Sequence, residues 1–191
     1  MKILLLLPLS LALTSLPTEP VAAPAATDWK VDPVHSSVVF KVKHAGASWF
    51  KGSFDKIEGT VSIDDAKPAE GSVKLKIPVD SIDTNDEKRD GHLKSADFFN
   101  YKENPEITFE SKKIEAKGKT LEVTGDLSLA GKTKSVTIPV EKVGEGEFHG
   151  RRAGYSTTFT IKRTDFGMTY GIEGNALGDE ITLMVDLELI Q

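Results

Sequence analysis

The stretch VKLKIPV (residues 73–79) has an apolar side chain at every second position, with lysine or proline between them. This alternation has the period of a β-strand that buries one face and leaves the other in water. An amphipathic helix would instead repeat its apolar residues three and four positions apart. The stretch therefore predicts a strand, and the runs on either side of it decide what kind of sheet that strand joins.

The same alternation recurs along most of the chain from residue 28 onward. Turn-forming residues separate the runs at 64–68, 116–119, 130–132 and 144–146. Eight or more short strands with regular turns predict an all-β fold, either an antiparallel barrel or a sandwich. The apolar parity includes Val38, Phe40, Val42, Phe54, Val61, Ile63, Ile107, Phe109, Leu121, Val123, Leu127, Leu129, Val136, Ile138, Val140, Phe159, Ile161, Ile181, Leu183, Val185, Leu187 and Leu189.

Three glycines, Gly52, Gly59 and Gly125, share the parity of these apolar positions. If that parity points inward, each glycine withdraws a side chain from the interior. A barrel of about eight strands is just wide enough to be filled by side chains or to hold one small ligand. The glycines therefore favour a barrel with a cavity. The alternative is that they mark bulges or corners where strands bend.

One stretch, SIDTNDEKRDGHLKSADFFN (residues 81–100), breaks the strand rhythm. Thr84 and Glu87 have the spacing of a capping box at a helix N-terminus. Gly91 interrupts the polar run that follows. We expect Thr84–Asn100 to form a broken helical connection between strands, lying over one end of the barrel.

The N-terminal segment has the order of a secretory signal peptide. A basic start at residues 1–2 precedes an apolar run from Ile3 to Leu13, and small residues follow. The sequence predicts residues 1–25 as a signal peptide and 26–191 as a single exported domain. The chain has no cysteine, so a packed core rather than disulfides must stabilise it.

The charge pattern limits the class of partner. The formal net charge is −5, and basic residues are interspersed with acidic ones rather than gathered in a run. This mild acidity argues against nucleic acid, and against an anionic membrane surface, as the main partner. The apolar N-terminal run is too short for a comfortable membrane span, so we expect no stable membrane insertion.

Several stretches match part of a motif for metal binding, nucleotide binding or nucleophilic catalysis, but none matches a complete motif. The acidic run beginning at Asp83 resembles a calcium loop, but lysine occupies the positions that need glycine and glutamate. The four histidines lack metal-ligand spacing, and GDLSLAGKT (residues 125–133) has five residues between its glycines where a phosphate loop needs four. Asp32, His35 and Ser36 lie close together, but neighbours on a strand point to opposite faces. We therefore predict no metal site and no catalytic residues, and expect residues 32–36 to close one barrel end through side-chain hydrogen bonds.

Taken in order, eight short motifs make the chain resemble the YceI-like family. Single motifs are weak, but together they cover essentially the whole chain from residue 28 to residue 191. The motifs are DPVHS (32–36), FKVKH (40–44), GSF (52–54), DT (83–84), RDGHL (89–93), DFF (97–99), PEITF (105–109) and RTDFG (163–167).

The resemblance implies a lipocalin-like antiparallel β-barrel with a short helical connection. It also implies an elongated apolar cavity that holds a polyisoprenoid or similar long-chain lipid, with no other cofactor. Family members are often periplasmic, which agrees with the predicted signal peptide. The resemblance supplies no catalytic residues, and it allows two barrels to pair as a homodimer.

The implied cavity and the inward parity together give a set of candidate ligand-binding residues. A hydrocarbon chain gains roughly 0.8 kcal/mol for each methylene that leaves water, so apolar walls alone can bind it. We expect three polar residues, Asp90, His92 and Arg163, at the rim. The expected lining residues are Phe40, Val42, Phe54, Val61, Phe109, Leu127, Phe159, Leu183 and Val185, with Phe98 and Phe99 near the mouth.

Two further functions fit the same sequence. An enzyme acting on a lipid or small amphiphile would need a polar cluster inside the cavity, such as His44 meeting an acid. A stress-linked structural protein would have a filled barrel. The sequence therefore predicts a periplasmic lipid carrier, with the contents of the barrel interior as the deciding observation.

Overall fold

The computed structural model describes residues 27–191. The predicted signal peptide, residues 1–25, lies outside the described residues. The strands are β1 (Thr27–Val31), β2 (Ser37–His44), β3 (Ser48–Phe54), β4 (Glu58–Ile63), β5 (Ser72–Pro78), β6 (Ile82–Asp83), β7 (Glu106–Lys117), β8 (Thr120–Leu129), β9 (Lys132–Glu147), β10 (Arg151–Lys162) and β11 (Leu177–Ile190). The helices are α1 (Glu87–Leu93) and four short 3-10 turns, η1 (Pro68–Glu70), η2 (Val79–Ser81), η3 (Arg163–Phe166) and η4 (Glu173–Asn175).

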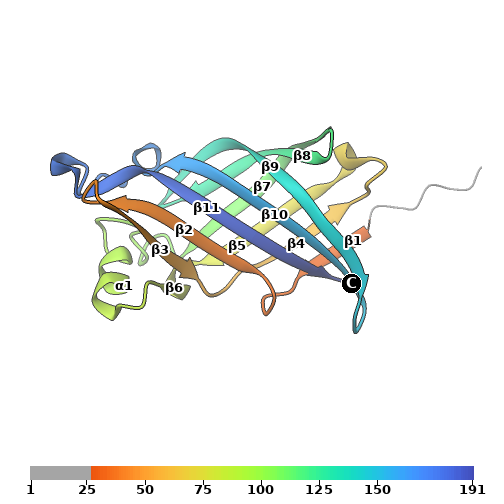
Figure 1. The fold of residues 1–191 in the computed structure, drawn as a ribbon, viewed down its shortest axis with the longest axis horizontal. Helices are drawn as coiled ribbons and strands as arrows, with labels where there is room; N and C mark the ends of the chain where they lie inside the picture. Colours follow the sequence, from red (N-terminus) through yellow and green to blue (C-terminus); the bar gives the residue numbers. More distant parts are fainter. Residues whose placement is uncertain (1–26) are drawn as a thin grey trace, which may run out of the picture.

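The strands form one sheet that closes on itself (Figure 1). Their order is β1-β4-β5-β7-β8-β9-β10-β11-β2-β3-β6, and β1 also pairs with β11. The segments β1 and β2 lie along the same edge of β11, while β4 pairs with β1 and β3 with β2. In the same way β5 pairs with β4 and β6 with β3. Counting each interrupted pair as one strand gives a closed antiparallel barrel of eight strands, as predicted.

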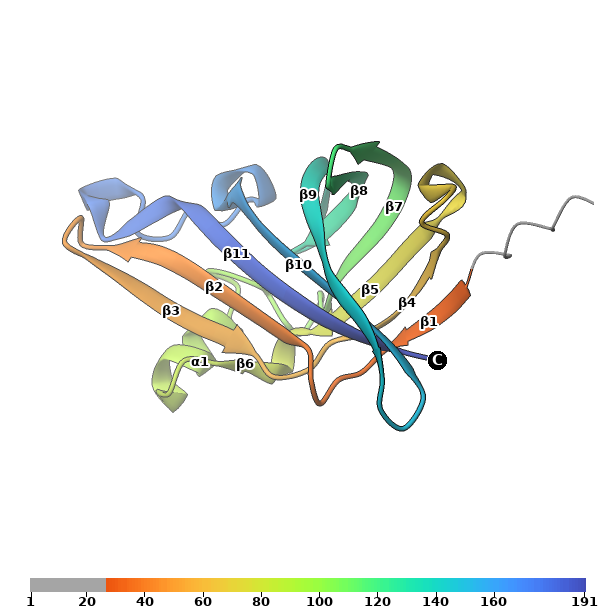
Figure 2. The same cartoon turned by 45° about the vertical axis from the view of Figure 1, so that its right-hand side comes forward.

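The connection that contains α1 lies beside β3 and β6 at one end of the barrel (Figures 1 and 2). The predicted capping box is wrong: Asp86 is the N-cap, and its carboxylate accepts a hydrogen bond from the Arg89 amide. Thr84 is separated from the helix because Asn85 has a left-handed backbone, with φ of 59°. The helix also runs through Gly91 to Leu93 without interruption.

The turn predicted at residues 144–146 is wrong as well. Strand β9 continues to Glu147, and the chain reverses at residues 148–150. Gly144 instead lies opposite Gly154 at the point where the β9–β10 register shifts. A glycine inside a strand is typical of such a bulge. The glycines at 144 and 146 predict a turn because turns and bulges share a preference for glycine.

The inward glycines do not leave holes in the interior. A Cβ added to Gly52 would lie 2.4 Å from the Phe40 ring, and one added to Gly125 would lie 2.6 Å from the Phe109 ring. Each aromatic ring therefore lies flat over a neighbouring strand in the space that the glycine vacates. The prediction that missing side chains create the cavity is wrong, although the interior is hollow elsewhere.

Replacing Gly125 with alanine should lower the free energy of unfolding by about 1–3 kcal/mol, because the new methyl group overpacks the Phe109 ring and the Glu110 carbonyl. Gly146→Ala is the matched control, since nothing lies within 4 Å of its added Cβ and the strand gains from losing a glycine. Urea denaturation of both variants measures the difference. Equal stability of the two variants would contradict the proposed packing.

Candidate functional site: the barrel cavity

The barrel encloses a cavity of about 630 Å³. Its walls come from the inward parity of the strands, together with the connection that contains α1 and the segment after β10. At the C-terminal end, Trp29, Ala153 and Leu189 are 2% exposed or less, so packed side chains fill that end of the barrel. The cavity therefore occupies the rest of the interior and is mostly apolar.

The structure places all eleven expected lining residues on the cavity wall. The strand period explains this, because one parity of every strand must face inward. Further wall residues lie on the same apolar parity of their strands and could have been predicted from the same alternation. Six of these are Val73, Leu75, Ile77, Leu121, Val123 and Ile138.

An aromatic cluster joins the connection to the barrel. The Phe54 ring lies 6.0 Å from the Phe40 ring and 5.7 Å from the Phe99 ring, the latter in an edge-to-face arrangement. Aromatic pairs of this geometry stabilise by about 0.5–1.5 kcal/mol beyond the area they bury. Phe98 is also buried, at 8% exposure. The two phenylalanines that close the connection therefore form part of the wall; Phe99 packs against β3, and Phe98 packs against His92 and Tyr170.

The β2–β3 hairpin tip, α1 and the segment after η3 lie at the same end of the barrel (Figure 2), and the exposed wall residues place the opening of the cavity there. Among the wall residues of the described chain, six are solvent-exposed, and all six belong to these three parts. We call this opening the mouth. The six residues are His44, Ser48, Trp49, Arg89, Tyr170 and Ala176.

Only one of the three residues expected at the polar rim has a side chain facing the mouth. His92 lies on the wall, bonds to the Asp97 carboxylate at 2.8 Å, and packs edge-on against the Tyr170 ring. Asp90 is not a wall residue, because its carboxylate accepts hydrogen bonds from the backbone and hydroxyl of Thr84. It holds the start of the connection instead.

Arg163 reaches the wall but is not an open rim residue. It is 3% exposed, and its guanidinium donates to three backbone carbonyls, those of Met168, Leu177 and Gly178. Burial lowers the pKa of this guanidinium, and nearby Asp179 acts in the opposite direction. The side chain therefore ties the segment after β10 to the start of β11, and it has little capacity left for a ligand head group.

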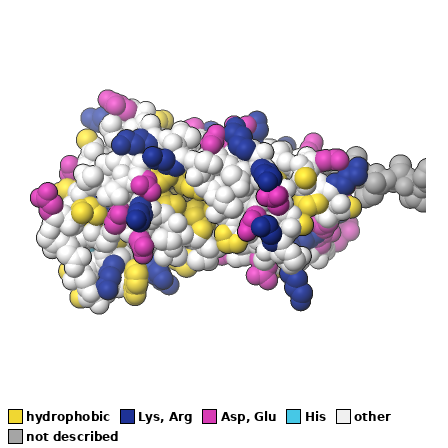
Figure 3. Space-filling view, turned by 90° about the horizontal axis from the view of Figure 1, so that it is seen from above, with side chains coloured by type: hydrophobic (Ala, Val, Ile, Leu, Met, Phe, Trp, Pro, Cys, Tyr) yellow, Lys and Arg dark blue, Asp and Glu magenta, His cyan; other side chains and the backbone are white. Residues whose placement is uncertain are grey.

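The two long strands β9 and β10 pair over only part of their length. Strands β9 and β10 pair from Arg151 to Ser156, and beyond that point the two strands separate. The Thr157 hydroxyl donates to the Pro139 carbonyl where the separation begins. In Figure 3, which views this face from above, apolar side chains are visible along the middle of the surface between polar ones. Backbone pairing between β9 and β10 therefore ends at Ser156.

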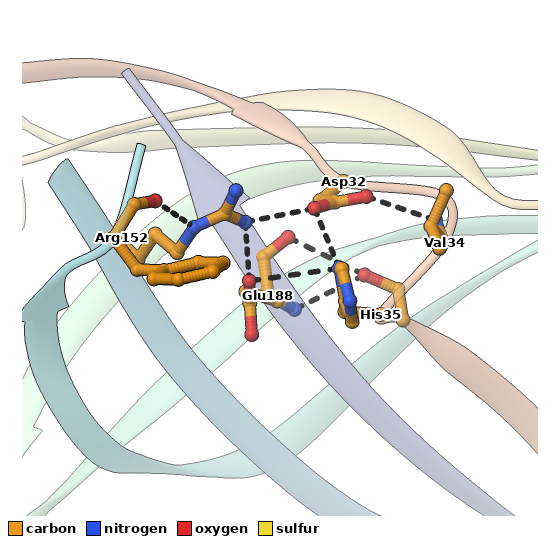
Figure 4. Close-up of polar contacts among 7 residues, drawn as sticks. Asp32, Val34, His35, Arg152 and Glu188 are labelled. Carbon is orange, nitrogen blue, oxygen red and sulfur yellow. Dashed lines mark hydrogen bonds and ion pairs between the residues drawn. The ribbon is translucent and has the colours of Figure 1, made fainter. Parts of the chain in front are cut away.

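A polar cluster closes the outside of the C-terminal end (Figure 4). The Asp32 carboxylate accepts hydrogen bonds from His35 Nδ1 at 2.9 Å and from Arg152 Nη1 at 2.8 Å. Arg152 also donates to the Glu188 carboxylate, and the Ser36 hydroxyl bonds to the Glu188 backbone. As predicted, residues 32–36 fasten this end through side-chain hydrogen bonds.

The same cluster brings three potential metal-ligand atoms, from Asp32, His35 and Glu188, within 4.8 Å of one another. The guanidinium of Arg152 already forms an ion pair with each of the two carboxylates, however. A cation bound there would have to displace or repel it. The arrangement is therefore better suited to an ion-pair network that joins the β1–β2 loop to β10 and β11.

Asp32→Asn should lower the free energy of unfolding by about 1–3 kcal/mol at neutral pH, because it removes a charged acceptor from His35 and Arg152. Hydrogen bonds from His35, Arg152 and the Val34 amide hold the pKa of Asp32 well below its usual range. A group with a depressed folded-state pKa stabilises above its unfolded-state pKa, about 3.9, and loses that contribution as pH falls through the folded value.

The stability gap between the wild type and Asp32→Asn should therefore narrow as the pH falls below about 4. Thermal melts from neutral to strongly acidic pH measure this gap. Asp126→Asn serves as a control, since its exposed carboxylate meets only Lys112 at 3.6 Å and such pairs contribute little. A gap that widened on acidification would contradict the assignment.

Comparison with known proteins identifies the family. The model of the YceI-like domain matches residues 29–189, which is nearly all of the described chain. The chain belongs to the YceI-like family. The UPF0312 protein PA0423 of Pseudomonas aeruginosa is 38% identical over 170 residues, covering 87% of this chain and 88% of that protein.

Solved structures show the same YceI-like barrel. Burkholderia cenocepacia BcnA superposes with a TM-score of 0.76 at 30% identity, over 83% of this chain and 98% of that one. A polyisoprenoid-binding domain from Saccharophagus degradans superposes with a TM-score of 0.65 at 17% identity, over 87% of this chain and 99% of that domain. The second likeness is a likeness of fold. Within residues 27–191, no helix has the length and apolar character needed to cross a membrane.

Proposed function

We propose that this YceI-like protein is a periplasmic carrier that holds a polyisoprenoid or similar long-chain lipid in its barrel. The observation that carries the proposal is the apolar cavity of about 630 Å³, opening at one end. Each methylene of a lipid that enters it gains roughly 0.8 kcal/mol. The polyisoprenoid binding named for the Saccharophagus degradans domain supports the same class of ligand.

The polar groups of the cavity wall favour an apolar lipid tail, rather than a polar ligand, in the depth of the cavity. The Thr157 hydroxyl and the Arg163 guanidinium donate to backbone carbonyls. Burial raises the pKa of the Tyr155 phenol, which is neutral at physiological pH even at its ordinary pKa of about 10. A lipid tail needs no hydrogen-bonding partner, so it fits such a wall, while its head group would stay at the mouth near Arg89 and His92.

One observation favours the alternative that the protein is an enzyme acting on an amphiphile. His92 and Asp97 form a histidine–carboxylate pair at the mouth, and such a pair can accept a proton. The predicted partner of His44 is absent, since within residues 27–191 no carboxylate lies at ion-pair distance from that side chain. A filled-barrel structural protein is disfavoured by the cavity itself.

The test is to purify the full chain from its host under native conditions, weigh it by native mass spectrometry and extract bound lipid. We expect a co-purifying long-chain lipid, or uptake of an added polyprenol by delipidated protein. A chain that carries no lipid and takes up no polyprenol would refute the carrier proposal. Lipid turnover that disappears in His92→Ala and persists in His35→Ala would favour the enzyme instead.

A further inference from the structure

The outer face of the β2–β3 hairpin carries three lysines that do not line the cavity. Val42 and Phe50 line the cavity, so their neighbours Lys41, Lys43 and Lys51 point to the outer face, and Trp49, which borders the mouth, lies on the same strand parity as Lys51. Lys41 lies opposite Lys51, and Lys43 lies opposite Trp49. We call these four residues the hairpin face. In Figure 3 basic and apolar side chains stand together at the lower left, at the end of the molecule that holds this hairpin.

The stability of the sheet does not explain this arrangement. Like charges directly opposite each other on neighbouring strands are destabilising. Several other strand lysines do meet acids: Lys76 contacts Glu106 at 3.1 Å and Lys117 contacts Glu122 at 3.0 Å. Within residues 27–191, the three lysines of the hairpin face have no carboxylate at ion-pair distance. Their positive charge is therefore available to a partner outside the chain.

Trp49 gives the hairpin face an apolar element with a polar edge. Its side chain is 59% exposed, and Lys41 Nζ lies 4.7 Å from the centre of its ring. Tyr170, 48% exposed, stands at the same mouth. Exposed tryptophan and tyrosine beside lysine are typical of the boundary between a lipid bilayer and water, where the ring lies at the level of the head groups.

We propose that the hairpin face docks the barrel mouth on an anionic phospholipid bilayer. The three lysines lie against lipid phosphates, and the Trp49 ring enters the head-group layer. The chain as a whole carries a net charge of −5, so the anionic lipids attract the hairpin face rather than the protein as a whole. This local attraction orients the mouth toward the membrane. Exposed charges are screened within about 8 Å at physiological ionic strength, so binding is weak, reversible and sensitive to salt.

This inference goes beyond the carrier proposal and does not depend on it. A barrel that held no lipid could still dock, and a barrel that carried lipid could still fail to dock. An anionic membrane is disfavoured as the main partner by the net charge and by basic residues that are interspersed with acids along the sequence. The pairing of β2 with β3, however, brings three lysines from two strands onto one surface. The alternation within a single strand does not reveal this local concentration of positive charge.

The test is flotation of the full chain with vesicles of phosphatidylglycerol and phosphatidylcholine, compared with phosphatidylcholine alone, at low and high salt. We expect binding only to the anionic vesicles at low salt. Each lysine removed should weaken binding about fivefold, so Lys41→Ser with Lys51→Ser should lose more than tenfold. The control removes two lysines at the β7–β8 turn, Lys117→Ser with Lys119→Ser, and should change binding less than twofold.

Tryptophan emission gives a second readout. Trp29 is 2% exposed and should not respond, so a blue shift on anionic vesicles reports Trp49 and should vanish in Trp49→Phe. The Lys41→Ser, Lys51→Ser variant should melt no lower than the wild type, because it relieves a like-charge pair. Equal vesicle binding by the hairpin and control variants overturns the proposal. Absence of anionic-vesicle binding by the wild type also overturns it, leaving an acidic protein surface as the partner to seek.

Discussion

Arg163→Ala should lower the free energy of unfolding by about 3 kcal/mol and loosen the segment between β10 and β11. The guanidinium donates to the carbonyls of Gly178 and Met168 at 2.8 Å and to that of Leu177 at 3.2 Å. In the wild type, these hydrogen bonds offset the free-energy cost of removing the guanidinium and the three carbonyls from water. In Arg163→Ala, the buried carbonyls lose their donors and the cost is no longer offset. Urea denaturation at neutral pH measures the loss.

The substitution should also affect the mouth. Met168 and Tyr170 lie on the segment that Arg163 fastens, and both are wall residues. Hydrogen exchange of residues 164–178 should therefore increase more in Arg163→Ala than exchange of β7 or β8. This local readout separates the fastening role from a general loss of stability.

Two controls define the chemistry of this contact. Arg163→Lys should recover less than half of the loss, because an ammonium cannot reproduce the planar fork that reaches three carbonyls. Arg151→Ala should cost less than about 1 kcal/mol, since that guanidinium is half-exposed and lies 3.8 Å from Glu145. Arg163→Ala as stable as Arg151→Ala would show that the buried contacts contribute nothing.

The strand period explains why the barrel and its wall were predictable. Once the alternation beginning at Val73 was assigned to strands, one parity of each strand had to face inward, and Phe40, Leu127 and Leu183 were placed on the wall by that rule alone. The family resemblance supplied the hollow interior, which the pattern did not. The predicted cavity exists, but the glycines do not create it, because the rings of Phe40 and Phe109 cover two of them.

The roles of polar residues were not predictable in the same way, because they depend on partners far along the chain. Arg163 bonds to carbonyls on β11, and Arg152 joins Asp32, which is 120 positions away. Neither the residue types nor their spacing reveals which groups the closure of the barrel brings together. The sequence therefore predicted Arg163 at the rim of the cavity. In the structure its guanidinium is buried and holds the segment after β10 against β11.

Leu183→Trp should weaken lipid binding about fiftyfold while leaving the barrel folded. Leu183 lies between Phe40 on β2 and Phe159 on β10 in the sheet register, and all three side chains line the cavity. The larger ring occupies space that the proposed lipid tail needs. Excluding about three methylenes costs about 2.4 kcal/mol, which corresponds to roughly fiftyfold weaker binding.

Met184→Trp provides the matched control, because the next residue of the same strand points to the outer face of the barrel. It should bind an added polyprenol with the affinity of the wild type, and both variants should melt within a few degrees of it. Native mass spectrometry measures occupancy, and titration with the polyprenol measures affinity. If Leu183→Trp remains folded and binds as tightly as Met184→Trp, the lipid does not lie in the barrel, and a ligand site outside the cavity has to replace this proposal.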